Sequence, residues 1–183
     1  MESKPVYTNV TMAGFGGQGL MFIGKLLAYC AMKRRLNVTW IPSYGPEVRG
    51  GTANCTVVIS DEPIGSPVIS SPEALIIMNN PSLEAFEPKL KTNGLLFVNS
   101  NLVTNEVKRR DVNVIPVPAN EAAADAGEKR AANMVIFGAY VAKTRIITKE
   151  NVAEGFKELF SAKAEALDAN IRAFEKGTKY AQT

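Results

Sequence analysis

The chain has 183 residues, of which 46% are hydrophobic and 21% charged, and a net charge of +3. This length favours one domain with one core over residues 1–183, and so small a net charge gives no support for nucleic-acid binding. The absence of histidine excludes imidazole as a catalytic base or metal ligand, and two cysteines cannot supply the four thiolates of an iron–sulfur cluster. The sequence shows neither a signal peptide nor an apolar run of about 18 residues that could span a membrane, so we expect a cytoplasmic protein without membrane contact.

Strand-like and helix-like runs alternate along the chain, which is typical of an α/β fold. The strand-like runs are apolar enough to be covered on both faces of a sheet. We expect strands at residues 7–12, 37–41, 53–59, 74–78, 95–99 and 112–116, and helices at 18–35, from about 81, at 120–126, 131–143, 149–159 and 162–175. The sequence therefore predicts a single α/β domain whose mixed or mostly parallel sheet is flanked by helices, with a helical C-terminal third.

A glycine-rich turn, Gly14-Phe15-Gly16-Gly17-Gln18-Gly19, joins the first strand to the first helix. Such a turn exposes backbone N–H groups at a helix N-terminus, which suits a phosphate, a carboxylate or a partner backbone, and we expect tight or positive-φ geometry at Gly14 and Gly16. The spacing fits G-x-G-x-x-G, but residues 37–42 lack the acidic side chain that would hold a ribose. A nicotinamide or flavin site is therefore disfavoured, while a turn that only packs a helix on the sheet stays open.

The two cysteines and two basic triplets have structural interpretations. Cys30 falls in an apolar helix pattern and Cys55 in an apolar strand, so we expect buried thiols. The triplets 33–35 and 108–110 are expected to be solvated at a helix end or in a loop.

A second unusual segment, Ser43-Tyr44-Gly45-Pro46-Glu47-Val48-Arg49-Gly50-Gly51, lies between the second and third expected strands. Its glycines and proline predict an irregular backbone that carries an aromatic ring and two opposite charges. A functional surface fits this chemistry, and so does a solvated connection with a local Glu47–Arg49 ion pair.

Together with Arg130-Ala131-Ala132-Asn133-Met134, these two segments resemble the gamma subunit of 2-oxoacid:ferredoxin oxidoreductases, and the likeness covers nearly the whole chain. The sequence of residues 45–52 is more similar to that of the 2-oxoglutarate branch than to that of the pyruvate branch. The resemblance implies one polypeptide of a complex that oxidatively decarboxylates a 2-oxoacid, forms an acyl-coenzyme A and reduces ferredoxin. Sister alpha and beta subunits, with delta as a further candidate, would be its partners.

The same resemblance implies thiamine diphosphate, magnesium and iron–sulfur clusters on the sister subunits, coenzyme A as cosubstrate, and neither a cofactor nor a catalytic residue on this chain alone. The glycine turn would offer backbone donors, and Arg49 would offer a planar fork that binds an anion. Glu47 would orient Arg49 or a neighbouring chain, and Tyr44 would supply a ring for stacking. Asn133 would either approach this surface or start a helix. The candidate cofactor or interface residues are Gly14, Gly16, Gly17, Gln18, Gly19, Ser43, Tyr44, Gly45, Pro46, Glu47, Arg49, Gly50 and Asn133. A stand-alone nucleotide-binding or regulatory module and a purely structural subunit remain as alternatives.

Overall fold

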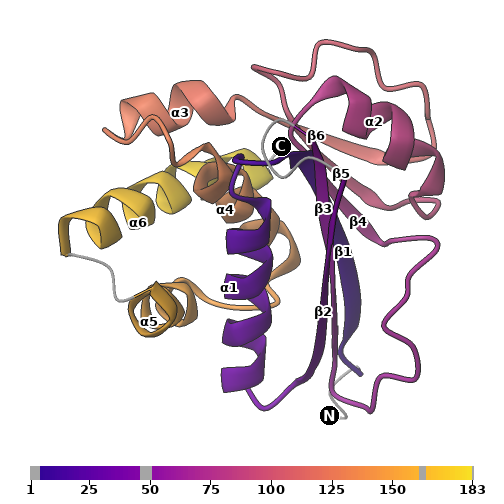
Figure 1. Ribbon diagram of the computed structural model, residues 1–183, viewed down its shortest axis with the longest axis horizontal. Coiled ribbons are helices and arrows are strands. Elements are labelled where there is room, and N and C mark those ends of the chain that lie inside the picture. The colour runs from indigo at the N-terminus through magenta and orange to yellow at the C-terminus, as the bar shows by residue number, and fades with distance from the viewer. Residues whose placement is uncertain (1–4, 46–50, 161–163, 183) are drawn as a thin grey trace.

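A computed structural model describes residues 5–45, 51–160 and 164–182. These residues form a mixed sheet in the order β2-β3-β1-β4-β5-β6, with helices on both faces (Figure 1). The strands are β1 (Tyr7–Phe15), β2 (Asn37–Tyr44), β3 (Thr52–Ser60), β4 (Ala74–Ile77), β5 (Leu95–Asn99) and β6 (Asn113–Val117). Strands β1, β4, β5 and β6 are parallel, whereas β3 pairs antiparallel with both β1 and β2. The expected α/β fold with a mixed sheet is confirmed.

Two unequal helical layers cover the sheet (Figure 1). Helices α1 and α4 pack on one face and α2 lies on the other, while α3, α5 and α6 extend the first layer. The helices are α1 (Leu20–Lys33), α2 (Asn80–Phe86), α3 (Ala119–Asp125), α4 (Ala132–Thr144), α5 (Lys149–Phe160) and α6 (Ala164–Thr178), with 3-10 turns η1 (Glu87–Lys89) and η2 (Lys179–Gln182). Of the described helices, none is long and apolar enough to cross a bilayer. The helical C-terminal third is confirmed.

The expectations about the end of strand β2 and about the cover of the sheet were wrong. Strand β2 continues beyond residue 41 because the β2–β3 hairpin keeps its pairing to Tyr44 opposite Ala53, so Ser43 and Tyr44 are strand residues and not part of an irregular loop. The sheet is also not covered on both faces throughout. The α2 side of the core reaches only β1, β4 and β5, and at the edge strand β2 the side chains of Ile41 and Tyr44 remain 39% and 51% exposed.

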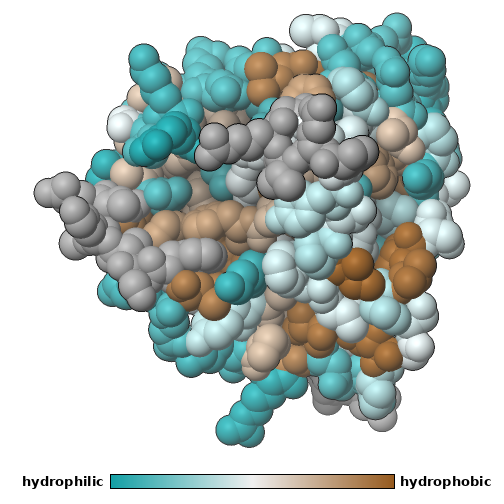
Figure 2. Space-filling model, viewed as in Figure 1, coloured by the Kyte–Doolittle hydropathy of each residue, from teal (hydrophilic) through white to brown (hydrophobic). Residues whose placement is uncertain are grey.

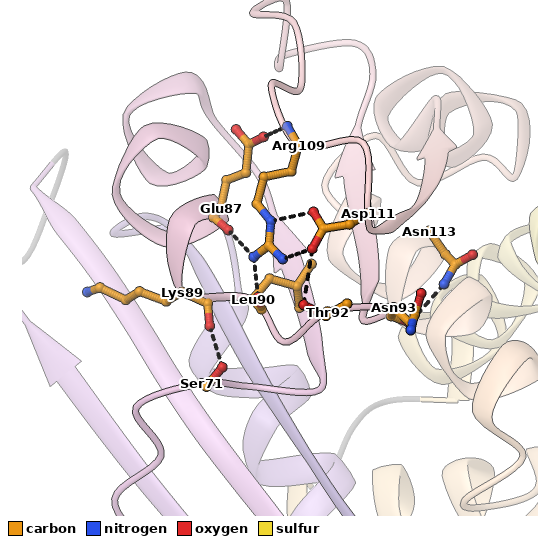
Figure 3. A network of polar contacts seen from close by, with 9 residues as sticks. All are labelled: Ser71, Glu87, Lys89, Leu90, Thr92, Asn93, Arg109, Asp111 and Asn113. Atoms are coloured by element: carbon orange, nitrogen blue, oxygen red, sulfur yellow. Dashed lines mark hydrogen bonds and ion pairs between the residues drawn. The ribbon is translucent and has the colours of Figure 1, made fainter.

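The long segment between β5 and β6 is held to the α2 layer by a polar network, which Figure 3 shows. The Glu87 carboxylate is buried, and its Oε1 accepts the backbone N–H groups of Lys108 at 2.6 Å and Arg109 at 2.7 Å. The Arg109 guanidinium donates to both carboxylate oxygens of Asp111 and to the Leu90 carbonyl. The triplet at 108–110 therefore lies in a loop as expected, but Arg109 is bound by protein groups and not only by water.

Both cysteines are buried, as expected. Cys30 in α1 is 1% exposed and Cys55 in β3 is inaccessible to solvent. Burial raises the pKa of each thiol to about 12, which keeps it protonated and unreactive at neutral pH.

Candidate functional site

The glycine turn lies where neighbouring parallel strands send their helices to opposite faces of the sheet. After β1 the chain enters α1 on one face, and after β4 it enters α2 on the other (Figure 1). A crevice at the carboxyl ends of two such strands is the usual ligand site of open α/β sheets. At this point Asn79 follows β4 and caps α2, since its Oδ1 accepts the Ser82 N–H at 2.8 Å.

Positive φ angles occur in this turn, but not where they were expected. Gly17 and Gly19 have φ of 99° and 76°, whereas Gly14 and Gly16 do not lie in the positive-φ region, so that part of the prediction was wrong. The reason is that β1 continues through Phe15, so Gly14 is an extended strand residue. Gly14 is nevertheless closely packed, because a Cβ atom there would lie 2.9 Å from the Met78 Cβ.

Helix α1 begins without a side-chain cap. Its N-cap is Gly19 in the left-handed conformation, with no side-chain hydrogen bond to the cap and no acidic residue in the first turn. The positive end of the helix dipole and the first N–H groups are therefore available to an anion or to a carbonyl group.

A pocket of about 320 Å³ joins the glycine turn to the end of β2. Its described lining residues are Phe15, Gly16, Gly17, Gly19, Leu20, Met21, Phe22, Tyr44 and Ala53. Figure 2 shows weakly hydrophobic, tan residues over the upper part of α1 and the adjoining helices. The pocket offers peptide groups, one phenol and apolar side chains, which can orient a group and exclude water from it.

The structure thus brings Gly16, Gly17 and Gly19 together with Tyr44 around one pocket. Gly16 N–H donates to the Gly51 carbonyl at 2.9 Å, which ties the turn to the start of β3. Gly45 closes the β2–β3 hairpin instead of lining the pocket, because its N–H donates to the Thr52 carbonyl at 2.8 Å. Ser43 is exposed in β2 and does not line the pocket, and Pro46, Glu47, Arg49 and Gly50 lie outside the described residues.

Gln18 and Asn133 contact the turn from behind the pocket. Gln18 hydrogen-bonds to the backbone of Phe15 and Met78, and Asn133 Nδ2 donates to the Gly19 carbonyl at 3.2 Å. Neither side chain is among the described residues that line the pocket. Asn133 therefore approaches the candidate surface from within helix α4, where it is 8% exposed.

Sequence reasoning missed the apolar wall formed by Met21 and Phe22. Both residues fall off the helical stripe of Leu20, Ile23 and Leu27, and that offset was the available signal that they face away from the sheet. Phe15 and Ala53 gave no such signal, because Phe15 reads as part of the glycine turn and Ala53 as an ordinary alternating strand position.

A larger pocket of about 660 Å³ lies between α2 and the segment before β6. Its polar groups already bind one another: Glu87 accepts two backbone N–H groups, and the Glu84 carboxylate accepts from Asn105 Nδ2 at 2.8 Å. It also shares no described lining residue with the pocket at the glycine turn. The pocket at the turn is therefore the stronger candidate site.

The described lining residues do not fit a thiamine diphosphate–magnesium site. Magnesium prefers carboxylate and other oxygen ligands in octahedral geometry, and the pocket side chains supply only the Tyr44 phenol. We therefore assign no step involving that cofactor to this pocket.

Comparison with known proteins identifies the family. The profile of the pyruvate ferredoxin/flavodoxin oxidoreductase family matches residues 9–180. The chain belongs to this family. The family predicted from the glycine turn and the 43–51 segment is confirmed.

Relatives within this oxidoreductase family carry different substrate names. The ketoisovalerate oxidoreductase subunit VorA of Methanothermobacter thermautotrophicus is 38% identical over 94% of this chain, which spans 36% of that relative's length. The 2-oxoglutarate synthase subunit KorC of Methanocaldococcus jannaschii is 31% identical over 94% of this chain and 93% of its own. The gamma subunit of the keto/oxoacid ferredoxin oxidoreductase of Geobacter sulfurreducens has the same fold, with a TM-score of 0.81, 29% identity and coverage of 96% of this chain and 98% of that subunit.

Proposed function

We propose that the chain is the gamma subunit of a cytoplasmic 2-oxoacid:ferredoxin oxidoreductase complex. The complex oxidatively decarboxylates a 2-oxoacid, transfers the acyl group to coenzyme A and passes two electrons to ferredoxin. Family membership and the near-complete overlap with the Geobacter gamma subunit support this role. Sister alpha and beta subunits, with delta as a further candidate, would hold thiamine diphosphate, magnesium and the iron–sulfur clusters. When bound there, the thiamine cofactor would supply the carbanion chemistry.

The observation that carries this proposal is the pocket that joins the glycine turn to Tyr44. It is built from peptide N–H groups, an exposed phenol and apolar side chains, and its described lining contains no acid or base of the carboxylate, amine or imidazole type. Such a surface can bind and orient a group presented by another chain. Gly16 and Gly17 permit close backbone approach, and the uncapped start of α1 favours a negative group.

We propose 2-oxoglutarate as the substrate, because the sequence of residues 45–52 resembles that of the 2-oxoglutarate branch of the family. The KorC relatives support this choice, since this chain covers 93% of the Methanocaldococcus subunit. Ketoisovalerate is the second candidate, favoured by the 38% identity to VorA.

Coexpression with the alpha and beta subunits of a 2-oxoacid:ferredoxin oxidoreductase tests the role. We expect a stable complex that reduces ferredoxin with 2-oxoglutarate and coenzyme A, faster than with ketoisovalerate or pyruvate. A complex that is fully active without this chain would reject the subunit role, whereas higher activity with ketoisovalerate would reject only the substrate.

A matched pair of variants tests the pocket itself. Tyr44 and Tyr7 are each 51% exposed, and they lie at opposite ends of the sheet. Tyr44→Ala should weaken assembly or turnover, while Tyr7→Ala should leave both unchanged. Equal effects of the two substitutions would show that the pocket has no special part in the complex.

A further inference from the structure

Gln18 occupies the crevice between the carboxyl ends of β1 and β4. Its Oε1 accepts the Phe15 N–H at 2.6 Å, and its Nε2 donates to the Met78 carbonyl at 3.1 Å. One carboxamide thus ties the end of β1 to the end of β4. Both halves of the amide are used, which an ionised carboxylate cannot reproduce because it only accepts hydrogen bonds.

Gly14 provides the space for this carboxamide. A Cβ atom on Gly14 would overlap Gln18 Oε1 and would lie 2.9 Å from Leu20 Cδ1. The glycine at the end of β1 is therefore explained by the side chain packed on it, since Gly14 itself is extended.

Asn133 holds the other end of the turn. Its Nδ2 donates to the Gly19 carbonyl, and a Cβ atom on Gly19 would lie 2.9 Å from Asn133 Cγ. Gly19 needs its left-handed φ to begin α1, and the amide from buried helix α4 packs directly on it. The turn is thus fixed from two sides by neutral amides.

We infer that Gln18 and Asn133 are positioning residues for the pocket and do not themselves contact the group it receives. That the two amides serve a partner-binding pocket rests on the proposed function. That they hold the glycine turn rests on the hydrogen bonds alone. Gly16, Gly17 and Gly19 line the pocket, whereas the two amides that hold the turn do not. The pocket is therefore shaped before a partner arrives, which reduces the ordering cost of binding.

Amide hydrogen exchange of the chain alone tests the geometry. Gln18→Ala and Asn133→Ala should each speed exchange at residues 15–20 by about fivefold or more, the ratio expected for loss of one ordinary hydrogen bond. Asn37→Ala is the matched control, because Asn37 Nδ2 also donates to a backbone carbonyl at 3.2 Å, that of Asp61, at the other end of the sheet. Exchange at residues 15–20 that stays at the wild-type rate in both turn variants would overturn the inference.

Gln18→Glu supplies a readout that simple loss of stability would not produce. The introduced carboxylate can still accept from Phe15 N–H, but it can donate to the Met78 carbonyl only when protonated. At each pH we divide the affinity of Gln18→Glu for the sister subunits by that of the wild type. We expect this ratio to fall as pH rises through the pKa of the introduced carboxyl and to recover below it. A ratio of the two affinities that does not change with pH would contradict the positioning role.

The two proposals fail in different ways. If the wild-type chain does not bind the sister subunits, the proposed function fails, and the exchange measurement on the chain alone still decides whether the amides fix the turn. If the wild type assembles and the turn variants assemble equally well, the positioning inference fails while the subunit role stands.

Discussion

Gly138 in α4 packs directly against the backbone of Phe174 in α6. A Cβ atom on Gly138 would lie 2.9 Å from the Phe174 carbonyl carbon, and one on Gly177 would lie 2.7 Å from the Val135 carbonyl carbon. The two helices therefore touch through their backbones, with a glycine on each side. This close approach buries α4 between α6 and the sheet and fixes the helix that carries Asn133.

Gly138→Ala should therefore destabilise the chain. Overpacking a close helix contact typically costs about 1–3 kcal/mol, and here the clash is with backbone that cannot rotate away. Gly65→Ala is the control, because a Cβ atom there meets nothing within 4 Å and its φ is not positive. Urea unfolding measures both free energies, and equal midpoints would show that the helices separate without cost.

Gly14→Val should impair both stability and assembly. The added side chain would displace Gln18 and press on Met78, with a cost of about 1–3 kcal/mol. The measurements are urea unfolding of the chain and its retention by the sister subunits. Wild-type behaviour in both would mean that the crevice has more room than the structure shows.

The Arg109–Asp111 pair predicts a pH dependence of stability. The hydrogen-bonded Arg109 guanidinium lowers the pKa of Asp111 to about 2. Because the folded-state pKa lies below the unfolded one, the pair stabilises the fold above about pH 4, and this contribution is lost as pH falls to about 2. The difference in Tm between wild type and Asp111→Asn should therefore be largest above pH 4 and shrink toward pH 2. Asp168→Asn, which changes an exposed aspartate on α6 outside this network, is the control.

The isolated chain should not oxidise 2-oxoacids. It has no histidine, too few cysteines for an iron–sulfur cluster, and a pocket whose described lining does not suit thiamine diphosphate with magnesium. Dye reduction with 2-oxoglutarate and coenzyme A should match the blank without protein, and calorimetry should detect no binding of thiamine diphosphate. Substantial turnover by the pure chain would reject the subunit role.

Arg49, which lies outside the described residues, stays the residue predicted to bind an anionic group of coenzyme A, substrate or a partner chain. Arg49→Lys keeps the charge but loses the planar fork that meets a carboxylate or phosphate with two hydrogen bonds. We expect weaker assembly, a higher KM for coenzyme A or 2-oxoacid, or lower turnover in the complex. An arginine that is only solvated would tolerate the change within about 0.5 kcal/mol, and all values would then equal those of the wild type.

The sequence predicted the elements well where local periodicity and burial agree. The strand at 95–99 matches β5 residue for residue, because that strand is apolar and bounded by a turn at Asn93-Gly94. Strand β1 was predicted too short because Gly14 and Phe15 read as turn residues, and the pairing of residues 13–15 with residues 52–54 in β3 extends it. Pairing with a distant strand is not visible in local sequence.

The candidate site was predicted in part for the same reason. The glycines identified the turn, but the φ values at Gly17 and Gly19 depend on where β1 stops and α1 starts. The role of Gln18 could not be deduced, because Met78, which accepts its hydrogen bond, is 60 positions away in the chain. Likewise, Asn133 reads as a helix-start residue until the fold places it against Gly19, 114 positions earlier.

The paired ends of the β2–β3 hairpin make the connection between them exchangeable. Tyr44 lies opposite Ala53, and the Gly45 N–H closes onto the Thr52 carbonyl, so the two strands are joined before the intervening residues begin. Connections between well-paired strands tolerate changes in sequence and length at little cost to the fold. The connecting residues of one relative can therefore be exchanged for those of another while the paired strands of the hairpin stay as they are.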